Sequence, residues 1–396
     1  MILSNANVFT ATPEPIRHDT SIRIEEGRIV GIGVQPNEDE RIVDLSGKWV
    51  TPGFVDAHVH LTLDGLIDPY DHEDYTVPEL TVIALKNAHQ QLQAGFTTVR
   101  DCGSRANIDV GIRNIIEQSG MSGPRIIAGG KTLAVTGGHG SFLGGWELDG
   151  ANEFRHAARA NIRDGVDFIK VIATGGVLTE GSEPGARAVT RDELAAVIDE
   201  AHRADCQVAV HAHGAEGIEV ALEMGVDTVE HCTYATNETL DQFEGSSAGY
   251  VSTIISTVVQ TTEEAISDGI RPYVTEKATE ALEAQLETFR AAQDREIPIL
   301  LGTDAGTPRN PHGTGAREFE QFVENGFSEA DALKAATIEP AKKLGLADEV
   351  GTIELGKVAD LVVLPDNPLS DITVTQRPDM IIKDGDKIMN SGEIQW

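Results

Sequence analysis

The feature that most constrains the fold is a series of eight short apolar runs, each long enough for one β-strand and separated by segments with helical patterns. Strand alternating with helix predicts a parallel sheet. Eight such units match an α/β fold of the (β/α)₈ TIM-barrel type, although a doubly wound open sheet shares the alternation. The runs lie at 54–58, 96–100, 125–129, 166–172, 207–211, 226–230, 250–255 and 297–303.

The two ends of the chain show a different pattern of short β-like runs broken by turn signals such as Glu26-Gly27 and Asp384-Gly385. These ends predict one small β-sandwich domain formed by 1–50 together with 346–396, around a barrel at 51–345. The β-like runs are 2–3, 19–25, 28–32 and 41–44 at the start, and 351–354, 361–364 and 380–383 at the end.

The chain of 396 residues is strongly acidic, with 64 Asp and Glu against 31 Lys and Arg and a formal net charge of −33. Nucleic acid and anionic membranes would be repelled, so neither is an expected partner. Acids scattered through folded-looking segments suggest a halophilic protein from a salt-rich cytoplasm, where ions screen the self-repulsion. An ordinary acidic soluble protein is the alternative.

Cysteine usage and the start of the chain indicate the compartment. Three cysteines, Cys102, Cys206 and Cys232, without CxxC spacing favour a reducing environment over a disulfide framework. The segment after Met1 has no basic region with a long apolar core, and no run approaches the length of a membrane span. We therefore expect a cytoplasmic protein.

The first run ends in His58 and His60. Side chains at i and i+2 of a strand point to the same face, so both imidazoles can reach one metal ion. Two unrelated polar residues at a strand end are an equally good interpretation of this motif alone.

Lys170 stands in the middle of the apolar run 166–172. Burial of an unpaired ammonium costs several kcal/mol, so the lysine is expected to be paired, neutral or modified. Pairing with a nearby carboxylate is the simpler interpretation. Carboxylation by CO₂, giving a carbamate that bridges two cations, is the alternative.

Three further runs end in a potential metal ligand or are directly followed by one, namely His211, His231 and Asp304. Barrel enzymes place their chemistry at the carboxyl ends of successive strands, which favours the barrel over the open sheet. A single polar residue at a strand end is commonplace, but five strands that supply HxH, Lys, His, His and Asp in order indicate a metal centre.

With these motifs, with TPGFVDAHVH at 51–60 and with GKVADLVVL at 356–364, the sequence resembles the amidohydrolase superfamily over essentially its whole length. The resemblance implies two divalent metal ions, with zinc as the expected element. It implies that Lys170 is N6-carboxylated and bridges the ions, and that Asp304 binds metal and handles the proton. The implied ligands are His58, His60, Lys170, His211, His231 and Asp304.

The chain resembles more closely the imidazolonepropionase-related branch, which includes Xaa-Pro and Xaa-Arg dipeptidases (amidohydrolase-type prolidases) and ochratoxin-type amidases. The matching segments are FIKVIATGG, HAHGAEGIEVALEMGVDTVEH and TGGHG. The resemblance implies that His139 polarises the scissile carbonyl and that Tyr234 binds the α-carboxylate of the substrate. It also implies a homo-oligomer.

The implied function is hydrolysis of an amide bond in a small molecule, a dipeptide (Xaa-Pro or related) or an N-acyl amino acid, by a metal-bridging hydroxide. Alternatives are imidazolonepropionase-like ring opening or deamination, lactone or phosphotriester hydrolysis at the same site, and a non-enzymatic assembly scaffold. His213 lies two residues after His211 on the same strand and could face the metals in its place or beside it, but the family pattern favours His211, so His213 is expected to have a supporting or structural role. His312 is a candidate for substrate contact, and 252–260 and 305–315 are the expected specificity loops.

Overall fold

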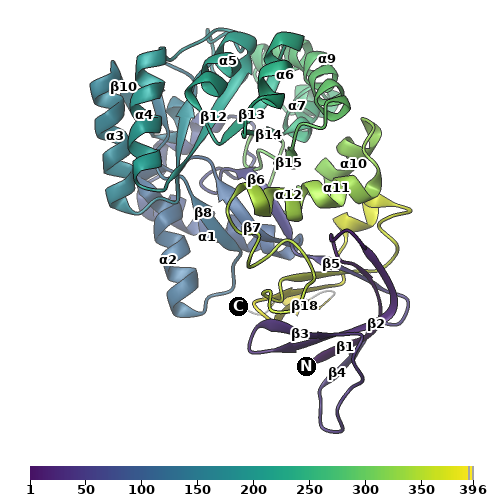
Figure 1. Cartoon of the computed structure of the whole chain (residues 1–396). Coiled ribbons are helices and arrows are strands. Elements are labelled where there is room, and N and C mark those ends of the chain that lie inside the picture. The colour runs from purple at the N-terminus through teal and green to yellow at the C-terminus, as the bar shows by residue number, and fades with distance from the viewer. Residues whose placement is uncertain (391–392, 395–396) are drawn as a thin grey trace.

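The computed structural model describes residues 1–390 and 393–394. Figure 1 shows a large domain of strands and helices above a smaller β domain, in which both chain termini lie. The two domains are linked by strand β5 (Trp49–Pro52), which pairs with strands of the small domain and leads directly into the first barrel strand.

Eight parallel strands form the barrel, as the alternating pattern predicts. The last strand meets the first where Asp304 N donates a hydrogen bond of 2.8 Å to His58 O. The third and fourth strands meet where Asp167 N donates one of 2.8 Å to Ala128 O. The eight strands are β6 (Phe54–Val59), β7 (Phe96–Asp101), β8 (Arg125–Ala128), β11 (Phe168–Ile172), β12 (Gln207–Gly214), β13 (Thr228–Tyr234), β14 (Gly249–Ser252) and β15 (Ile299–Leu301).

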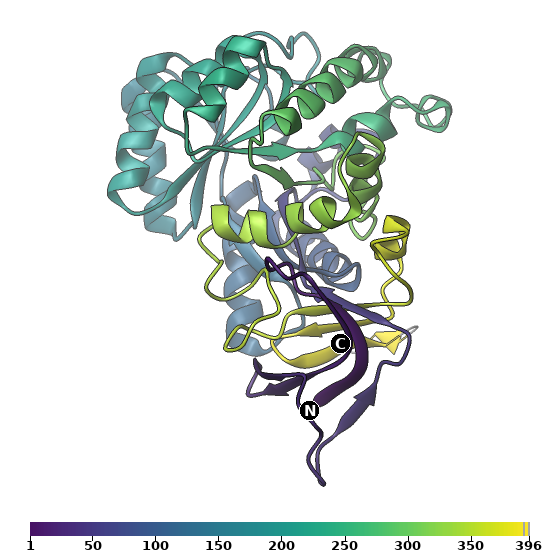
Figure 2. The ribbon, with the colours of Figure 1, turned by 45° about the vertical axis from the view of Figure 1, so that its right-hand side comes forward.

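Helices surround these strands (Figure 2). Local sequence sets several of the helix boundaries. At α4 the Thr190 hydroxyl accepts a hydrogen bond from Glu193 N, while the Glu193 carboxylate accepts one from Thr190 N. The principal helices are α1 (Val77–Gln93), α2 (Ile108–Ser119), α3 (Ala151–Asp164), α4 (Arg191–Arg203), α5 (Ala215–Met224), α6 (Asn237–Glu244), α9 (Pro272–Asp294), α10 (Arg317–Glu324), α11 (Glu329–Ala335) and α12 (Ile338–Lys343).

The predicted strand at 250–255 is too long. Strand β14 ends at Ser252, and helix α7 (Ile254–Gln260) follows. The buried carboxylate of Glu318, on α10, accepts hydrogen bonds from Ile254 N at 2.8 Å and Ile255 N at 2.6 Å. A distant carboxylate therefore stabilises the start of this helix, which the local apolar pattern does not reveal.

The small domain contains a nine-stranded mixed sheet in the described residues, and it confirms the prediction of one β domain built from both termini. The expected strand at 351–354 is wrong. Ile353 is buried in the core of this domain, and its N–H donates to Thr10 O outside any strand ladder. The other strands of this sheet are β1 (Ile2–Phe9), β2 (Ile16–Glu25), β3 (Arg28–Ile32), β4 (Ile42–Asp44), β16 (Leu361–Leu364), β17 (Met380–Lys383), β18 (Asp386–Asn390) and β19 (Glu393–Ile394).

In the described part of the chain, no helix combines the length and the apolar character that crossing a bilayer requires. The three cysteines are buried free thiols.

Candidate metal centre

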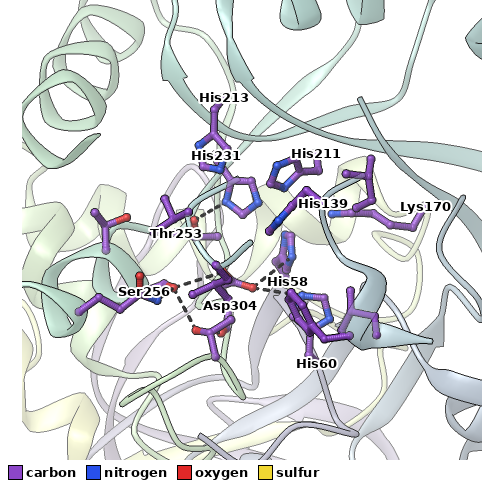
Figure 3. Close-up of a pocket in the computed structure, with 18 residues that line it drawn as sticks. His58, His60, His139, Lys170, His211, His213, His231, Thr253, Ser256 and Asp304 are labelled. Atoms are coloured by element: carbon purple, nitrogen blue, oxygen red, sulfur yellow. Dashed lines mark hydrogen bonds and ion pairs between the residues drawn. The ribbon is translucent and has the colours of Figure 1, made fainter. Parts of the chain in front are cut away.

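A pocket opens at the carboxyl ends of the barrel strands, and seven of the eight predicted site residues line it (Figure 3). Each comes from a barrel strand or from a loop that follows a strand, which explains why residues far apart in sequence meet there. These seven are His58, His60, His139, Lys170, His211, His231 and Asp304.

The first and last barrel strands supply one potential ligand group. Asp304 Oδ1 lies 3.2 Å from Nε2 of His60 and 3.5 Å from Nε2 of His58. Ligand atoms of the three residues lie within 4.8 Å of one another. Two imidazoles and a carboxylate form a donor set that zinc accepts.

The fifth and sixth barrel strands supply a second group, formed by His211, His213 and His231, whose ligand atoms also lie within 4.8 Å of one another. His211 Nε2 lies 3.1 Å from Gly175 O. Because a carbonyl can only accept, this nitrogen carries the proton and Nδ1 keeps the lone pair. In Figure 3 this group lies above His58, His60 and Asp304.

His213 lies closer to the centre than its expected supporting role suggests. Its ring stacks on that of His231, with the centroids 4.8 Å apart and the planes at 14°. Its Nδ1 is 2.7 Å from Thr233 Oγ1, which leaves Nε2 available to the pocket. Strand β12 continues through this residue, so His211 and His213 share a face as i and i+2.

Lys170, on β11, lines the same pocket with 1% of its surface exposed. Among the described residues its Nζ has no hydrogen-bond partner, so the expected pairing with a carboxylate is not found. A buried ammonium without a partner is unfavourable. The donor set of two histidine groups, Asp304 and this orphaned nitrogen fits a metal pair that a modified lysine completes.

Two of the predicted ligands have backbone conformations that are rare outside glycine. The φ angles are 73° at His231 and 55° at Asp304, both in the left-handed region. Such conformations persist only where the surrounding structure enforces them, and they cluster at functional sites.

Burial controls the charge of the pocket. Burial and the nearby Lys170 ammonium together lower the pKa of His58 to about 4, although the Glu230 and Asp304 carboxylates act in the opposite direction. Burial would raise the pKa of the Asp304 carboxyl, but hydrogen bonding to His60 and the charges around it hold that pKa well below its usual range. Neutral imidazoles and an ionised carboxylate are the forms that bind metal.

His139 follows β9 (Leu133–Val135) and faces the second ligand group, with its ring centroid 4.7 Å from that of His211. Its Nδ1 hydrogen-bonds to Thr179 Oγ1 at 2.9 Å. A Cβ at Gly176 would lie 2.3 Å from its Nε2, so only glycine lets the loop after β11 approach this ring.

Tyr234 and His312 lie outside this pocket. Tyr234, at the end of β13, lines a neighbouring pocket together with Glu183, Lys277 and Glu280. His312 is 3% exposed, and its Nε2 lies 3.0 Å from Leu63 O. Its position outside the metal pocket contradicts the expectation that it contacts substrate. The ring instead hydrogen-bonds to backbone carbonyls of the loop after β6.

The walls of the metal pocket differ in polarity. Helix α7 provides Ser256, Thr257 and Gln260 on one side, where a loop was expected. The apolar lining residues of the pocket are Phe142, Leu143, Ile172, Val177 and Leu178. Among the described lining residues, Lys170 is the only lysine or arginine.

Sequence reasoning missed two charged residues beneath the pocket, Arg100 and Glu230, which form a fully buried ion pair. Arg100 stands in the apolar strand run 96–100 and Glu230 in the run 226–230. Because charged residues are rarely buried unless they are paired, their opposite charges could have predicted an ion pair between the two strands.

Comparison with known proteins agrees with this geometry. Ochratoxinase of Aspergillus niger is 30% identical over 359 residues, covering 83% of this chain and 72% of its own. The crystal structure of a Xaa-Pro dipeptidase with methionine bound in its active site is 32% identical, with a TM-score of 0.89 over 98% of both chains. A prolidase complexed with N-methylphosphonate-L-proline is 26% identical, with a TM-score of 0.92 over 98% of this chain and 99% of that one.

Imidazolonepropionase of Geobacillus kaustophilus is more distant, 22% identical over 419 residues that cover 94% of this chain and 91% of its own. The sequence pattern of the Amidohydrolase family matches residues 49–388. The chain therefore belongs to the amidohydrolase family, as its strand-end motifs predicted.

Proposed function

We propose that the protein is a binuclear metal-dependent hydrolase that cleaves the amide bond of a dipeptide, Xaa-Pro or related, or of an N-acyl amino acid. The observation that carries the proposal is the meeting of two histidine groups, Asp304 and the orphaned Lys170 in one pocket. The likeness to a Xaa-Pro dipeptidase and a prolidase supports the choice of substrate.

His58, His60 and Asp304 would hold one divalent ion, with Zn²⁺ as the expected element, and His211 and His231 the other. Lys170 would bridge them after its amine nitrogen adds to CO₂ and loses a proton, giving a carbamate. Two such ions would let a bound water ionise near neutral pH, and they would polarise the scissile carbonyl of the substrate.

Asp304 would move the proton. Its carboxylate is ionised, and its Oδ2 accepts a hydrogen bond of 3.2 Å from the Ser256 hydroxyl, which fixes its orientation. It would take the proton from the attacking water and deliver it to the leaving amine. His139, with Nδ1 held by Thr179, would donate from Nε2 to the oxygen of the scissile carbonyl.

The pocket walls suggest a neutral substrate side chain. The apolar lining residues Phe142, Val177 and Leu178 would accept such a side chain. Apart from Lys170, the described lining residues include no lysine or arginine that would favour an acidic side chain. Tyr234 would bind the α-carboxylate at the edge of the neighbouring pocket.

The test is hydrolysis of a library of dipeptides and N-acyl amino acids by the Zn²⁺-loaded protein. We expect cleavage of members with neutral apolar side chains, and no cleavage by a matched Lys170→Ala variant. A protein that binds two zinc ions and cleaves no amide, but opens an imidazolone or a lactone, would contradict the proposal.

A further inference from the structure

An ion pair lies in the barrel interior directly beneath the metal pocket. Arg100, on β7, and Glu230, on β13, are 1% and 0% exposed. Nη2 of Arg100 donates to Oε1 of Glu230 at 2.8 Å and to Oε2 at 2.9 Å. A pair so far from water is stable only if its remaining donors and acceptors are also satisfied.

The remaining polar atoms of the pair find partners. Nε of Arg100 donates to Ala57 O at 2.7 Å and Nη1 to Thr228 Oγ1 at 2.9 Å. The Thr228 hydroxyl donates to Glu230 Oε1 at 2.6 Å, and the guanidinium lies 5.1 Å from the centre of the Phe168 ring. The Glu230 carboxylate is therefore held in one orientation.

The Glu230 carboxylate also contacts His58. Glu230 Oε2 lies 2.8 Å from Nδ1 of His58. A carboxylate paired with a guanidinium is ionised and can only accept, so Nδ1 must carry the proton. The lone pair of the imidazole then stays on Nε2, the nitrogen that lies 3.5 Å from Asp304 Oδ1 in the pocket.

We propose that Arg100 and Glu230 are positioning residues of the metal centre, which fix the tautomer and the ring orientation of His58 so that Nε2 is presented to the ion. This inference rests on the metal site of the proposed function. Partners of this kind behind a ligand histidine commonly change metal affinity about 10–100-fold when they are removed.

The competing explanation is that the pair serves only to hold β7 and β13 together. Both explanations predict a change in stability, so stability cannot separate them. Only positioning predicts a loss of metal affinity that depends on His58.

The experiment compares Zn²⁺ affinity, measured by competition with a chelator, and the Tm of the metal-free protein. The variant Arg100→Met/Glu230→Met removes both charges and keeps similar volumes. Arg125→Met/Asp360→Met is the matched control, because it removes a 3.0 Å pair at the first residue of β8, the end of the barrel away from the pocket. We expect about a 10–100-fold loss of Zn²⁺ affinity in the first variant and none in the control.

The same pair is then removed from a His58→Ala protein. If the pair acts through His58, its removal there causes no further loss of Zn²⁺ affinity. An equal loss with and without His58, or no loss in either background, would overturn the inference. Should the double variant not fold, Glu230→Gln keeps the shape of the side chain and carries the same expectation, because an amide does not compel the proton onto Nδ1.

The two proposals fail differently. A parent protein that binds no Zn²⁺ overturns both. A parent that binds Zn²⁺ but cleaves no amide overturns the proposed substrate only. In that case the Zn²⁺ affinities of the variants still decide the role of Arg100 and Glu230.

Discussion

Asp304 Oδ1 lies 3.2 Å from Nε2 of His60, although one residue follows the last barrel strand and the other follows the first. Closure of the barrel creates this contact, through hydrogen bonds between the segment 303–305 and the end of β6. The metal pocket therefore depends on the closed barrel. The role of each pocket residue can be tested by single substitutions.

Substitution of Lys170 by Met should abolish Zn²⁺ binding and activity together. It should also raise the Tm of the metal-free protein, because an unpaired buried ammonium costs several kcal/mol and Met does not. Metal analysis and thermal denaturation check this. The control is Lys277→Met, since Lys277 Nζ hydrogen-bonds to Thr179 O at 2.8 Å outside the ligand groups. Retention of two zinc ions by Lys170→Met would contradict the assignment of the bridge.

Asp304→Asn should lower kcat by about 10²–10⁴-fold, because an amide cannot take the proton from the attacking water. Steady-state kinetics on the best substrate of the library would measure the loss. Ser256→Ala is the matched control, since it removes the 3.2 Å hydrogen bond to Oδ2, along with hydroxyl contacts to Thr307 and Gln260, but keeps the carboxylate and should cost far less. Equal kinetics for the parent and Asp304→Asn would remove Asp304 from the chemistry.

Tyr234→Phe should raise KM for dipeptides with a free α-carboxylate and leave kcat nearly unchanged. A hydrogen bond to a charged group is worth about 1.5–3 kcal/mol, which corresponds to roughly a 10–150-fold change in KM. The same dipeptides with an amidated C-terminus serve as the control and should not distinguish the two proteins. If the parent and Tyr234→Phe had the same KM for dipeptides with a free α-carboxylate, the substrate α-carboxylate would bind away from Tyr234.

Glu200 should make stability depend on pH. Hydrogen bonds from Arg159 on α3 lower its pKa to about 2, against burial and with help from Arg155. Its folded pKa is below the unfolded value, so the unfolded chain takes up the proton first as pH falls. The stabilisation is complete above about pH 4.5 and is lost as the pH falls toward 2.

Thermal denaturation of the parent and of Glu200→Gln should therefore show a Tm difference at pH 6 that shrinks progressively below pH 4.5. A difference that stays constant down to pH 3 would mean that the ion pair does not stabilise the contact between α3 and α4.

The net charge of −33 should make Tm rise with salt. The screening length falls from about 30 Å at 0.01 M to about 3 Å at 1 M, so repulsion between surface carboxylates weakens as NaCl is added. Denaturation at increasing NaCl concentrations checks this, with a sucrose series as the control for effects that do not involve charge. A Tm that is independent of NaCl would remove the argument for a halophilic protein.

Much of the barrel follows from local pattern. The runs at 54–58, 207–211 and 226–230 are apolar because parallel strands are buried on both faces, and a histidine at the end of each run or directly after it indicates the carboxyl end of the strand. Strand β3 has the limits of the run expected at 28–32, and helices α3 and α5 end directly before Gly165 and Gly225, which have the left-handed conformation typical of a helix end. The potential metal ligands were predictable for the same reason, because chemistry at a barrel mouth must come from strand ends.

Other features depend on partners far away in sequence. Helix α7 begins where the Glu318 carboxylate meets two of its amides, and His213 enters the pocket because β12 continues past His211. The start of α7 leaves no mark in the local sequence, since its deciding partner lies on another element, whereas the i and i+2 spacing of His211 and His213 is visible in the sequence but does not show how far the strand extends.

The sequence by itself determined the alternation of strand and helix, the acidic surface and the residue types of a metal centre. Only the tertiary structure decided which charges meet. Arg100 and Glu230 look like isolated defects in two apolar strands, but the closed barrel places them within 2.8 Å of each other and the carboxylate within 2.8 Å of His58. Hydrogen bonding has a range of about 3 Å, so it acts only after folding has brought its partners together.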